Sequence, residues 1–323
     1  MNVALIIFNR PQHTEQVFRR IAAARPERLF IIADGTREGV PGEAAKVAAA
    51  RAVTEVVDWP CEVKRNYAPV NLGCGVRPAT GITWVFEHVE DCIILEDDCV
   101  PDATFFPFCQ ELLNRYRDSE SVMSISGDQF IRRRLPGKAS YIFSRYPLVW
   151  GWATWRRAWA KFDYNLTHWP ELRGTSWLSK LLGSERAAAY WSDRFDVVAG
   201  GRRRDIWDIT WVFANLLNNG LCIHPATNLV ANMGFGVEST HTQERAGFAT
   251  TTTEAMAFPL RQPRGTDANG PYDRRLLDVV FSPRSTLWDR ITCRYTYGIL
   301  IRRIPLFGRV WTHWRERKRR EQA

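Results

Sequence analysis

Three kinds of segment are missing from this 323-residue sequence, and each absence excludes a class of protein. No apolar run approaches the ~18–20 residues that a membrane-spanning helix needs. The seven cysteines have no regular spacing and no CxxC pair, which argues against a disulfide framework or a structural zinc site. Residues 1–8 have no basic region and no small-residue cleavage site, so we expect a strand there and no signal peptide. These absences favour a cytoplasmic protein with reduced thiols.

Evenly spread positive charge is missing as well. The net charge is +9, but residues 284–323 contain eleven Lys and Arg against three acidic residues, which leaves residues 1–283 close to neutral. Proteins that bind nucleic acid usually distribute basic charge along a groove. We therefore expect no nucleic-acid partner.

The basic segment also carries apolar residues at helical spacing, namely Phe307, Val310, Trp311 and Trp314. Aromatic residues beside a basic cluster are typical of a helix lying on an anionic membrane surface. A helix docked on the protein body with a solvated basic end fits the same pattern. We expect a basic amphipathic C-terminal extension over residues 286–323, and a protein that is cytoplasmic or peripheral on the inner face of the membrane.

Apolar runs and helical patterns alternate along the first 130 residues. Strands are predicted over residues 3–8, 29–33, 61–66, 92–95 and 122–126. Helices are predicted over residues 12–24, 44–57, 78–90 and 104–117. This alternation predicts an α/β fold with a mostly parallel central sheet flanked by helices. Residues 261–285 are rich in Pro, Gly, Asp and Arg, and are predicted to be a linker.

Acidic residues follow three of the predicted strands at the point where each strand ends. These are Asp34 before Gly35, the run Glu96-Asp97-Asp98, and Asp128 after Gly127. Ligands of such sheets bind beyond the carboxyl ends of the strands. The coincidence predicts a binding site at this edge.

The three consecutive carboxylates of Glu96, Asp97 and Asp98 suit a hard divalent cation. Mg²⁺-type ions take one or two carboxylates and complete their coordination with water and phosphate oxygens. An Asp at a strand end can instead cap the next helix, and Pro101-Asp102 suggests that one starts there. Three adjacent carboxylates repel each other unless a cation is bound, which favours the metal site.

These residues resemble a known family. Residues 93–98, with Val100-Pro101-Asp102 and Phe105-Phe106 after them, resemble the Glu-Asp-Asp segment of GT-A fold glycosyltransferases. The resemblance is to the N-acetylglucosaminyltransferase I type and to bacterial glycosyltransferase family 2-like proteins. It covers roughly residues 1–245.

The resemblance implies a nucleotide-sugar site in the first half. Phe8-Asn9-Arg10 is similar to the segment that meets the nucleotide, in which an Arg approaches the diphosphate. Asp34 stands where the family's Asp accepts from the uracil ring. Residues 71–75 resemble the loop before the helix that leads to the metal strand. The residues implied to bind the nucleotide sugar are Asn9, Arg10, Asp34, Arg77, Glu96, Asp97 and Ser239.

The second half supplies looser similarities. Val149-Trp150-Gly151-Trp152 resembles the Gly-Trp segment of the acceptor region, and Ile206-Trp207-Asp208 the stretch that carries the catalytic base. Residues 232–236, with Ser239 and His241, resemble the loop that closes over the donor. Asp98 and His241 are implied as metal ligands.

The resemblance implies a metal-dependent glycosyltransferase that uses Mn²⁺ or Mg²⁺. A sugar would pass from a nucleotide donor, UDP-linked by expectation, to a hydroxyl of a glycan or lipid-linked acceptor, with inversion, in bacterial surface glycan or glycoconjugate synthesis. The transferase domain would span residues 1–260, with a nucleotide-sugar-binding half at 1–130 and an acceptor-side half at 131–260.

Alternatives remain at several positions. The related enzymes carry two adjacent acids after the Trp, whereas Ile209 follows Asp208 here, so the base is Asp208 or Asp205. We prefer Asp208, although an acid in a first helical turn also complements the helix dipole. Arg10 could be a surface residue and Asp34 a turn residue. Of the four tryptophans at 150–159, we expect one to stack on sugar and the others to pack.

Other enzyme classes fit less well. A sugar nucleotidyltransferase should have a Gly-rich loop after the first strand, where this chain has Asn9-Arg10-Pro11. The Asp-x-Asp-x-Thr run of one phosphatase class is absent. The alternative from another class is a catalytically inactive protein of the same fold that acts as a membrane-surface adaptor.

Overall fold

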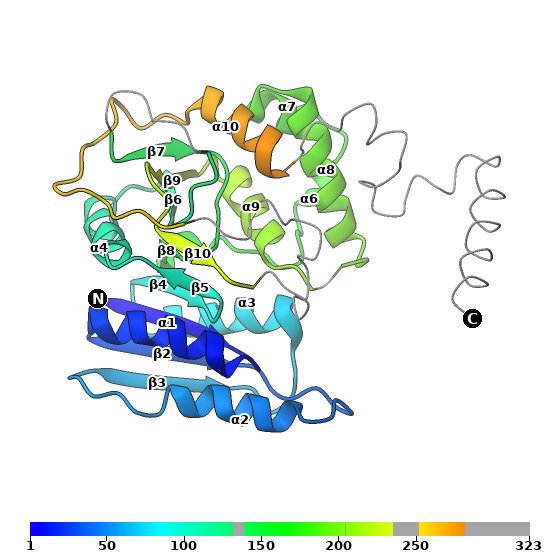
Figure 1. Ribbon diagram of the computed structural model, residues 1–323. Helices are drawn as coiled ribbons and strands as arrows, with labels where there is room; N and C mark the ends of the chain where they lie inside the picture. Colours follow the sequence, from blue (N-terminus) through cyan, green and yellow to red (C-terminus); the bar gives the residue numbers. More distant parts are fainter. Residues whose placement is uncertain (132–138, 204, 235–251, 282–323) are drawn as a thin grey trace, which may run out of the picture. The chain divides into compact units, whose positions relative to one another are not determined.

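The structure is a computed structural model that describes residues 1–131, 139–203, 205–234 and 252–281 (Figure 1). Residues Met1–Val280 form one compact unit. The predicted basic extension, 286–323, lies outside the described residues.

An eight-stranded sheet runs through this unit in the order β3-β2-β1-β4-β8-β6-β9-β7. Its strands are β1 (Asn2–Ile7), β2 (Arg28–Ala33), β3 (Glu62–Tyr67), β4 (Asp91–Glu96), β6 (Val122–Ser126), β7 (Tyr141–Ser144), β8 (Trp152–Trp155) and β9 (Leu221–Pro225). Only β8 and β7 run against the others. A second, two-stranded sheet pairs β5 (Cys99–Pro101) with β10 (Val230–Asn232). The predicted α/β fold with a mostly parallel sheet is confirmed.

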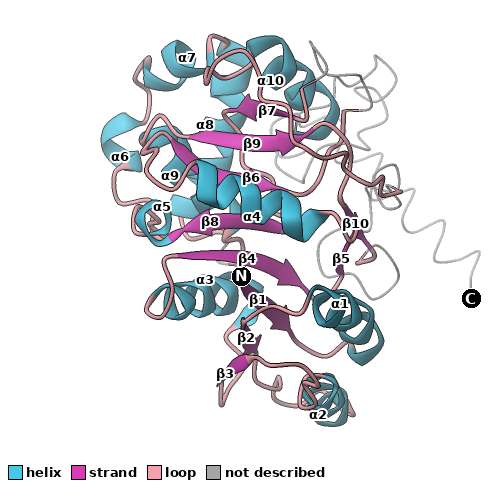
Figure 2. Ribbon diagram, turned by 90° about the vertical axis from the view of Figure 1, so that its left-hand side faces the viewer, coloured by secondary structure: helices cyan, strands magenta, loops and turns pink. Residues whose placement is uncertain are grey.

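Helices cover both faces of the sheet (Figure 2). On one face, α1 (Pro11–Ala24) and α4 (Phe105–Arg115) bury apolar side chains against β1 and β4. On the other face lie α3 (Gly73–Phe86), α5 (Arg156–Trp159) and α9 (Asp208–Leu217). Because β1, β2 and β4 are buried on both faces, their sequences are almost continuously apolar and do not alternate.

The other described helices complete the unit. They are α2 (Glu43–Val53), which packs on α1, and α6 (Trp169–Leu172), α7 (Trp177–Leu182), α8 (Glu185–Ala199) and α10 (Gly270–Leu276), with a π-helical turn at Leu277–Phe281. No helix among the described residues is both long and apolar enough to cross a membrane. Six cysteines are described, all as free thiols, and four of them are buried.

The predicted linker over residues 261–285 differs from the structure. Residues 261–280 belong to the folded unit and run along β7, the last strand of the sheet. The Ser140 amide donates to the Arg261 carbonyl at 2.9 Å, and the Asn269 amide to the Phe143 carbonyl at 2.9 Å. The buried Asp273 carboxylate accepts from the Ser144 hydroxyl at 2.6 Å. These residues form a segment, called the strap below, that covers an edge of the sheet. The strap is rich in Pro and Gly, as linkers are, which is why its sequence predicts a linker.

Candidate active site at the carboxyl edge of the sheet

The candidate site lies where β1, β2, β4 and β6 end. These strands are parallel, so the residues that follow them meet at one edge, and β8 enters the sheet from that edge because it runs the other way. Glu96 is the last residue of β4. Arg10 follows β1, the strand that lies next to β4 in the sheet. The sheet order thus brings together residues that are about ninety positions apart in the chain.

The three carboxylates occupy the sharp turn from β4 into β5. Asp97 and Asp98 are buried, and Glu96 is partly exposed. The Phe8 amide donates to Asp97 Oδ2 at 3.4 Å, and the Cys99 thiol to Asp98 Oδ1 at 3.4 Å. The following helix, α4, has Thr104 as its N-cap residue, and the Thr104 side chain makes no capping hydrogen bond. Asp102 Oδ1 accepts from the Thr104 amide at 2.8 Å in the turn before the helix. The helix-capping interpretation is therefore not supported for the three acids, whose described contacts lie elsewhere.

Arg10 is the cation within this cluster. Its Nη1 donates to Asp98 Oδ2 at 3.0 Å, and its Nη2 pairs with Asp97 Oδ1. The guanidinium thus spans two neighbouring carboxylates from the end of β1. The structure does not support the interpretation of Arg10 as a solvated surface residue.

The cluster is nevertheless short of positive charge. Burial, followed by the negative charges of Asp98 and Asp97, raises the pKa of Glu96 to about 8, and Asp208 acts in the same direction. Burial also raises the pKa of Asp97 to about 6, although Arg10 opposes this shift. Four acids share one guanidinium here, so a further bound cation would reduce the electrostatic repulsion among their carboxylates.

A divalent cation fits this donor set. The available atoms are carboxylate oxygens, which Mg²⁺ and Mn²⁺ prefer. Within the residues that the structure describes, no three His, Cys, Asp or Glu side chains are arranged to hold a metal by themselves. An ion held here by one or two carboxylates would need its other ligands from water or from a phosphate-bearing substrate.

Asp208 reaches the same cluster from the second half of the chain. It is the first residue of α9 and is partly exposed, and its charge acts on Glu96. Its Oδ1 accepts from the Ile209 amide at 2.9 Å. Asp205 is engaged differently, because both its oxygens pair with Arg203, at 2.7 and 2.9 Å.

Asp34, after β2, caps the start of α3. Its two carboxylate oxygens accept from the amides of Leu72 and Gly73 at 2.8 and 2.9 Å. Gly35 is needed beside it, since a Cβ there would collide with the backbone of Val70. Asp34 Oδ1 also accepts from the Gly35 amide at 2.8 Å, as the turn interpretation expects, and contact with a base stays a prediction.

Arg77 was predicted to bind the nucleotide sugar, and the structure gives its guanidinium another task. The side chain is buried, and it donates to the Ala33 carbonyl at 3.1 Å and to Asn66 Oδ1 at 2.9 Å. It also bonds the Asn66 carbonyl. Arg77 thus holds the carboxyl ends of β2 and β3 together, behind the predicted donor site.

Asn9 belongs to a small polar group that the sequence did not reveal. Its Nδ2 donates to Glu43 Oε1 at 3.0 Å, and Arg37 binds the same carboxylate through its amide at 2.8 Å and its Nε. Arg37 also lies over the Phe8 ring, with 5.5 Å between Cζ and the ring centroid. Only the proximity of Asn9 to the end of β1 could have indicated this group.

The predicted closing loop starts directly at the acids. β10 pairs with β5, and the Met233 amide donates to the Asp98 carbonyl at 2.9 Å. A Cβ at Gly234 would collide with Asp98 Oδ2. Ser239 and His241, the remaining predicted residues of this loop, lie outside the described residues.

The tryptophan-rich stretch is mainly core. Trp152, Trp155 and Trp159 are buried, whereas Trp150 is partly exposed and meets Phe130 edge-on, with 5.0 Å between ring centroids. Asp128, at the end of β6 on the same side, is buried, and its Oδ1 has no hydrogen-bond partner among the described residues. Trp150 is therefore the tryptophan of this stretch that a ligand could reach.

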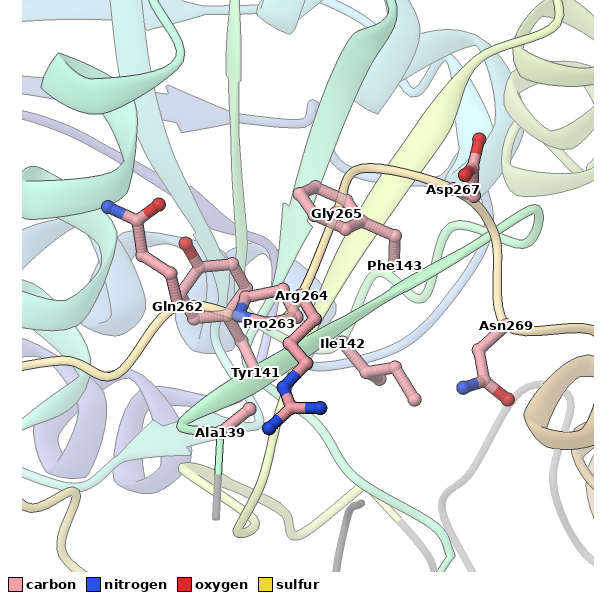
Figure 3. A pocket seen from close by; sticks show the side chains of 10 residues that line it. All are labelled: Ala139, Tyr141, Ile142, Phe143, Gln262, Pro263, Arg264, Gly265, Asp267 and Asn269. Atoms are coloured by element: carbon pink, nitrogen blue, oxygen red, sulfur yellow. The ribbon is translucent and has the colours of Figure 1, made fainter. Parts of the chain in front are cut away.

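A separate cavity lies at the far margin of the sheet, between β7 and the strap. Figure 3 shows Tyr141 and Phe143 on the strand side, with Arg264 and Asn269 from the strap around the opening. β7 is four strands beyond β4, which separates the two strands by roughly 19 Å at ~4.8 Å per strand. The cavity plays no part in the candidate active site.

No protein-family profile matches this chain, and no curated protein resembles it in sequence. Among solved structures, the galactosyltransferase LgtC in complex with donor and acceptor sugar analogs matches with a TM-score of 0.37 and 11% identity, over 90% of this chain and 99% of that chain. Residues 1–349 of S. aureus TarS match with a TM-score of 0.39 and 8% identity, over 71% of this chain and 59% of that chain.

Proposed function

We propose that this protein is a metal-dependent glycosyltransferase of the GT-A type, which transfers a sugar from a nucleotide-diphosphate donor to a hydroxyl group. The observation that carries the proposal is the meeting of Glu96, Asp97, Asp98, Arg10 and Asp208 at the carboxyl edge of a mostly parallel sheet. The order of the family-like motifs along the sequence agrees with it.

Asp98 is the proposed metal ligand, with His241 as a second one from the closing loop. When bound there, Mn²⁺ or Mg²⁺ would neutralise charge that builds up on the diphosphate as its bond to the sugar breaks. Arg10 would orient the diphosphate through its paired N–H donors. The segment at Met233 and Gly234 lies against Asp98. The proposed role of the loop that follows in the sequence is to exclude water from the donor.

Asp208 is the proposed general base. It would take the proton of the acceptor hydroxyl as that oxygen attacks the anomeric carbon, and a single displacement of this kind inverts the carbon. Asp205 suits the role less well because Arg203 occupies both its oxygens. Trp150 would offer an apolar ring face to the acceptor sugar on the side of β8.

The proposal is tested by calorimetric titration of UDP into the protein with Mn²⁺ and with EDTA. We expect binding with Mn²⁺ that EDTA abolishes. Asp98→Asn should weaken it by at least the ~10–100-fold that follows loss of a residue supporting a metal ligand. Asp102→Asn is the matched control, because it lies four residues away and keeps the oxygen that accepts from the Thr104 amide.

The other outcomes are equally informative. Metal-dependent binding of a different nucleotide would change the donor and leave the reaction class in place. If no nucleotide binds in the presence of Mn²⁺, the transferase proposal is rejected, and the inactive membrane-surface adaptor becomes the better hypothesis.

A further inference from the structure

Arg10 binds the same carboxylates that a metal ion would bind. Its guanidinium contacts Asp97 and Asp98 at once, and its own side chain is only 25% exposed. The Asp97 side chain is 3% exposed and that of Asp98 12%. The ion pairs are therefore partly shielded from water, where charge pairs are stronger than at an open surface.

Each carboxylate oxygen of Asp98 already has a partner in the free protein. Its Oδ1 accepts from the Cys99 thiol, and its Oδ2 accepts from Arg10 at 3.0 Å. Gly234 lies so near that a Cβ there would collide with Oδ2. A Mg²⁺-type ion sits ~2.0–2.1 Å from its ligand oxygen. An ion at Oδ2 would then face the positive guanidinium at close range, so the two cations compete for one carboxylate.

We propose that Arg10 is an exchangeable counter-ion that makes metal binding depend on the nucleotide. In the free protein it pairs with both Asp97 and Asp98. When metal and nucleotide bind together, the metal takes the carboxylate oxygen and the guanidinium passes to the diphosphate. This inference rests on the proposed function and adds to it a regulation of the same site by one residue.

The physical reason is the cost of leaving a charge without a partner. A metal ion that displaced Arg10 alone would leave the guanidinium unpaired in a partly buried position, which is strongly unfavourable. A diphosphate supplies the replacement partner, because its oxygens match the two parallel N–H donors of arginine. Binding of the metal ion therefore raises the affinity for the nucleotide through Arg10, and binding of the nucleotide raises the affinity for the metal ion. By linkage the two affinities rise by the same factor.

The test measures Mn²⁺ binding alone and Mn²⁺ binding with saturating UDP, by electron paramagnetic resonance of the free ion. For Arg10→Gln we expect opposite changes: Mn²⁺ alone binds about tenfold more tightly than in the native protein, while the enhancement by UDP shrinks by a similar factor. Arg10→Lys keeps a point charge without the fork and should give intermediate values. It also serves if Arg10→Gln does not fold.

Arg19→Gln is the control, since Arg19 pairs with Glu15 on the exposed face of α1. It should leave both affinities unchanged. Unchanged affinity for Mn²⁺ alone in Arg10→Gln would overturn the inference, because Arg10 would then be a diphosphate ligand only. Weaker binding under both conditions would overturn it too, as expected of a purely structural residue. If the native protein binds no Mn²⁺ with UDP, the proposed function fails and the inference with it.

Discussion

Asp205 and Asp208 lie three residues apart, yet their surroundings differ. Asp205 is held by both nitrogens of an Arg203 fork, while the charge of Asp208 is felt by Glu96 in the acid cluster. A residue that must accept a proton needs a carboxylate oriented toward the substrate. At the scale of single residues, this difference favours Asp208.

Asp208→Asn should lower kcat by roughly 10²–10⁴-fold, because the amide cannot accept the proton of the acceptor hydroxyl. Binding of UDP with Mn²⁺ should stay within a factor of about three. The measurement is the initial rate of UDP release from a UDP-sugar in the presence of acceptor. Asp205→Asn is the matched comparison, and a larger loss in that variant than in Asp208→Asn would reassign the base.

At the scale of secondary structure elements, a buried polar group connects β9 with α10. His224 Nε2 donates to the Tyr146 carbonyl at 2.7 Å, and its Nδ1 lies 2.9 Å from the Tyr272 hydroxyl. The tautomer follows from the carbonyl, which can only accept. Burial lowers the pKa of His224 to about 4, so the imidazole is neutral in the folded protein near neutral pH.

This shift predicts lower stability in acid. In the unfolded chain the histidine has a pKa of ~6.5 and binds a proton at pH values where the buried His224 stays neutral. The free energy of unfolding therefore falls as the pH drops from about 6.5 to about 4. The contribution of His224 reaches up to about 3 kcal/mol. Burial raises the pKa of Asp273 to about 6, which works in the opposite direction over part of this range.

Urea unfolding of native protein and His224→Asn between pH 7 and 4.5 isolates the histidine, because Asp273 is present in both. The variant should be less stable at pH 7 and should show a flatter pH dependence. Exposed His88→Asn should keep the native slope. Parallel curves for native protein and His224→Asn would contradict the assignment.

The elements of the first half were predictable because they are regular. Buried parallel strands read as unbroken apolar runs, and residues 122–126 were predicted with the bounds that β6 has. The start of α3 was misplaced at Pro78, since proline favours a first turn. The helix begins at Gly73 because Asp34, far away in sequence, accepts from the amides of Leu72 and Gly73.

The second half gave weaker signals for a physical reason. β7 and β8 have four residues each, and the four tryptophans around β8 show no clear strand period. The acids were predictable as a cluster because they are consecutive in the sequence and end a buried strand. The ion pairs of Arg10 were not, because the sequence does not show which cation would meet three adjacent carboxylates.

At the scale of the whole molecule, the strap determines where the folded unit ends. Leu276 is fully buried in α10, so Leu276→Ala should cost about 2–5 kcal/mol in the free energy of unfolding. Exposed Arg275→Ala, one residue earlier, should change it by no more than about 0.5 kcal/mol. Chemical denaturation of the full chain measures both. Equal stability of the two variants would restore the linker interpretation.

The strap also covers β7, one of the two edge strands at which the sheet could pair with a strand of another chain. At the opposite margin, β3 carries Glu62, Lys64 and Arg65, and Glu62 pairs with Arg28 of β2 at 3.0 Å. Charged side chains on an edge strand discourage pairing with another chain. One edge of the sheet is thus covered by the strap, and the other carries charged side chains. If the strap detached in part, the edge of β7 would be exposed and could pair with strands of other chains in an amyloid-like way.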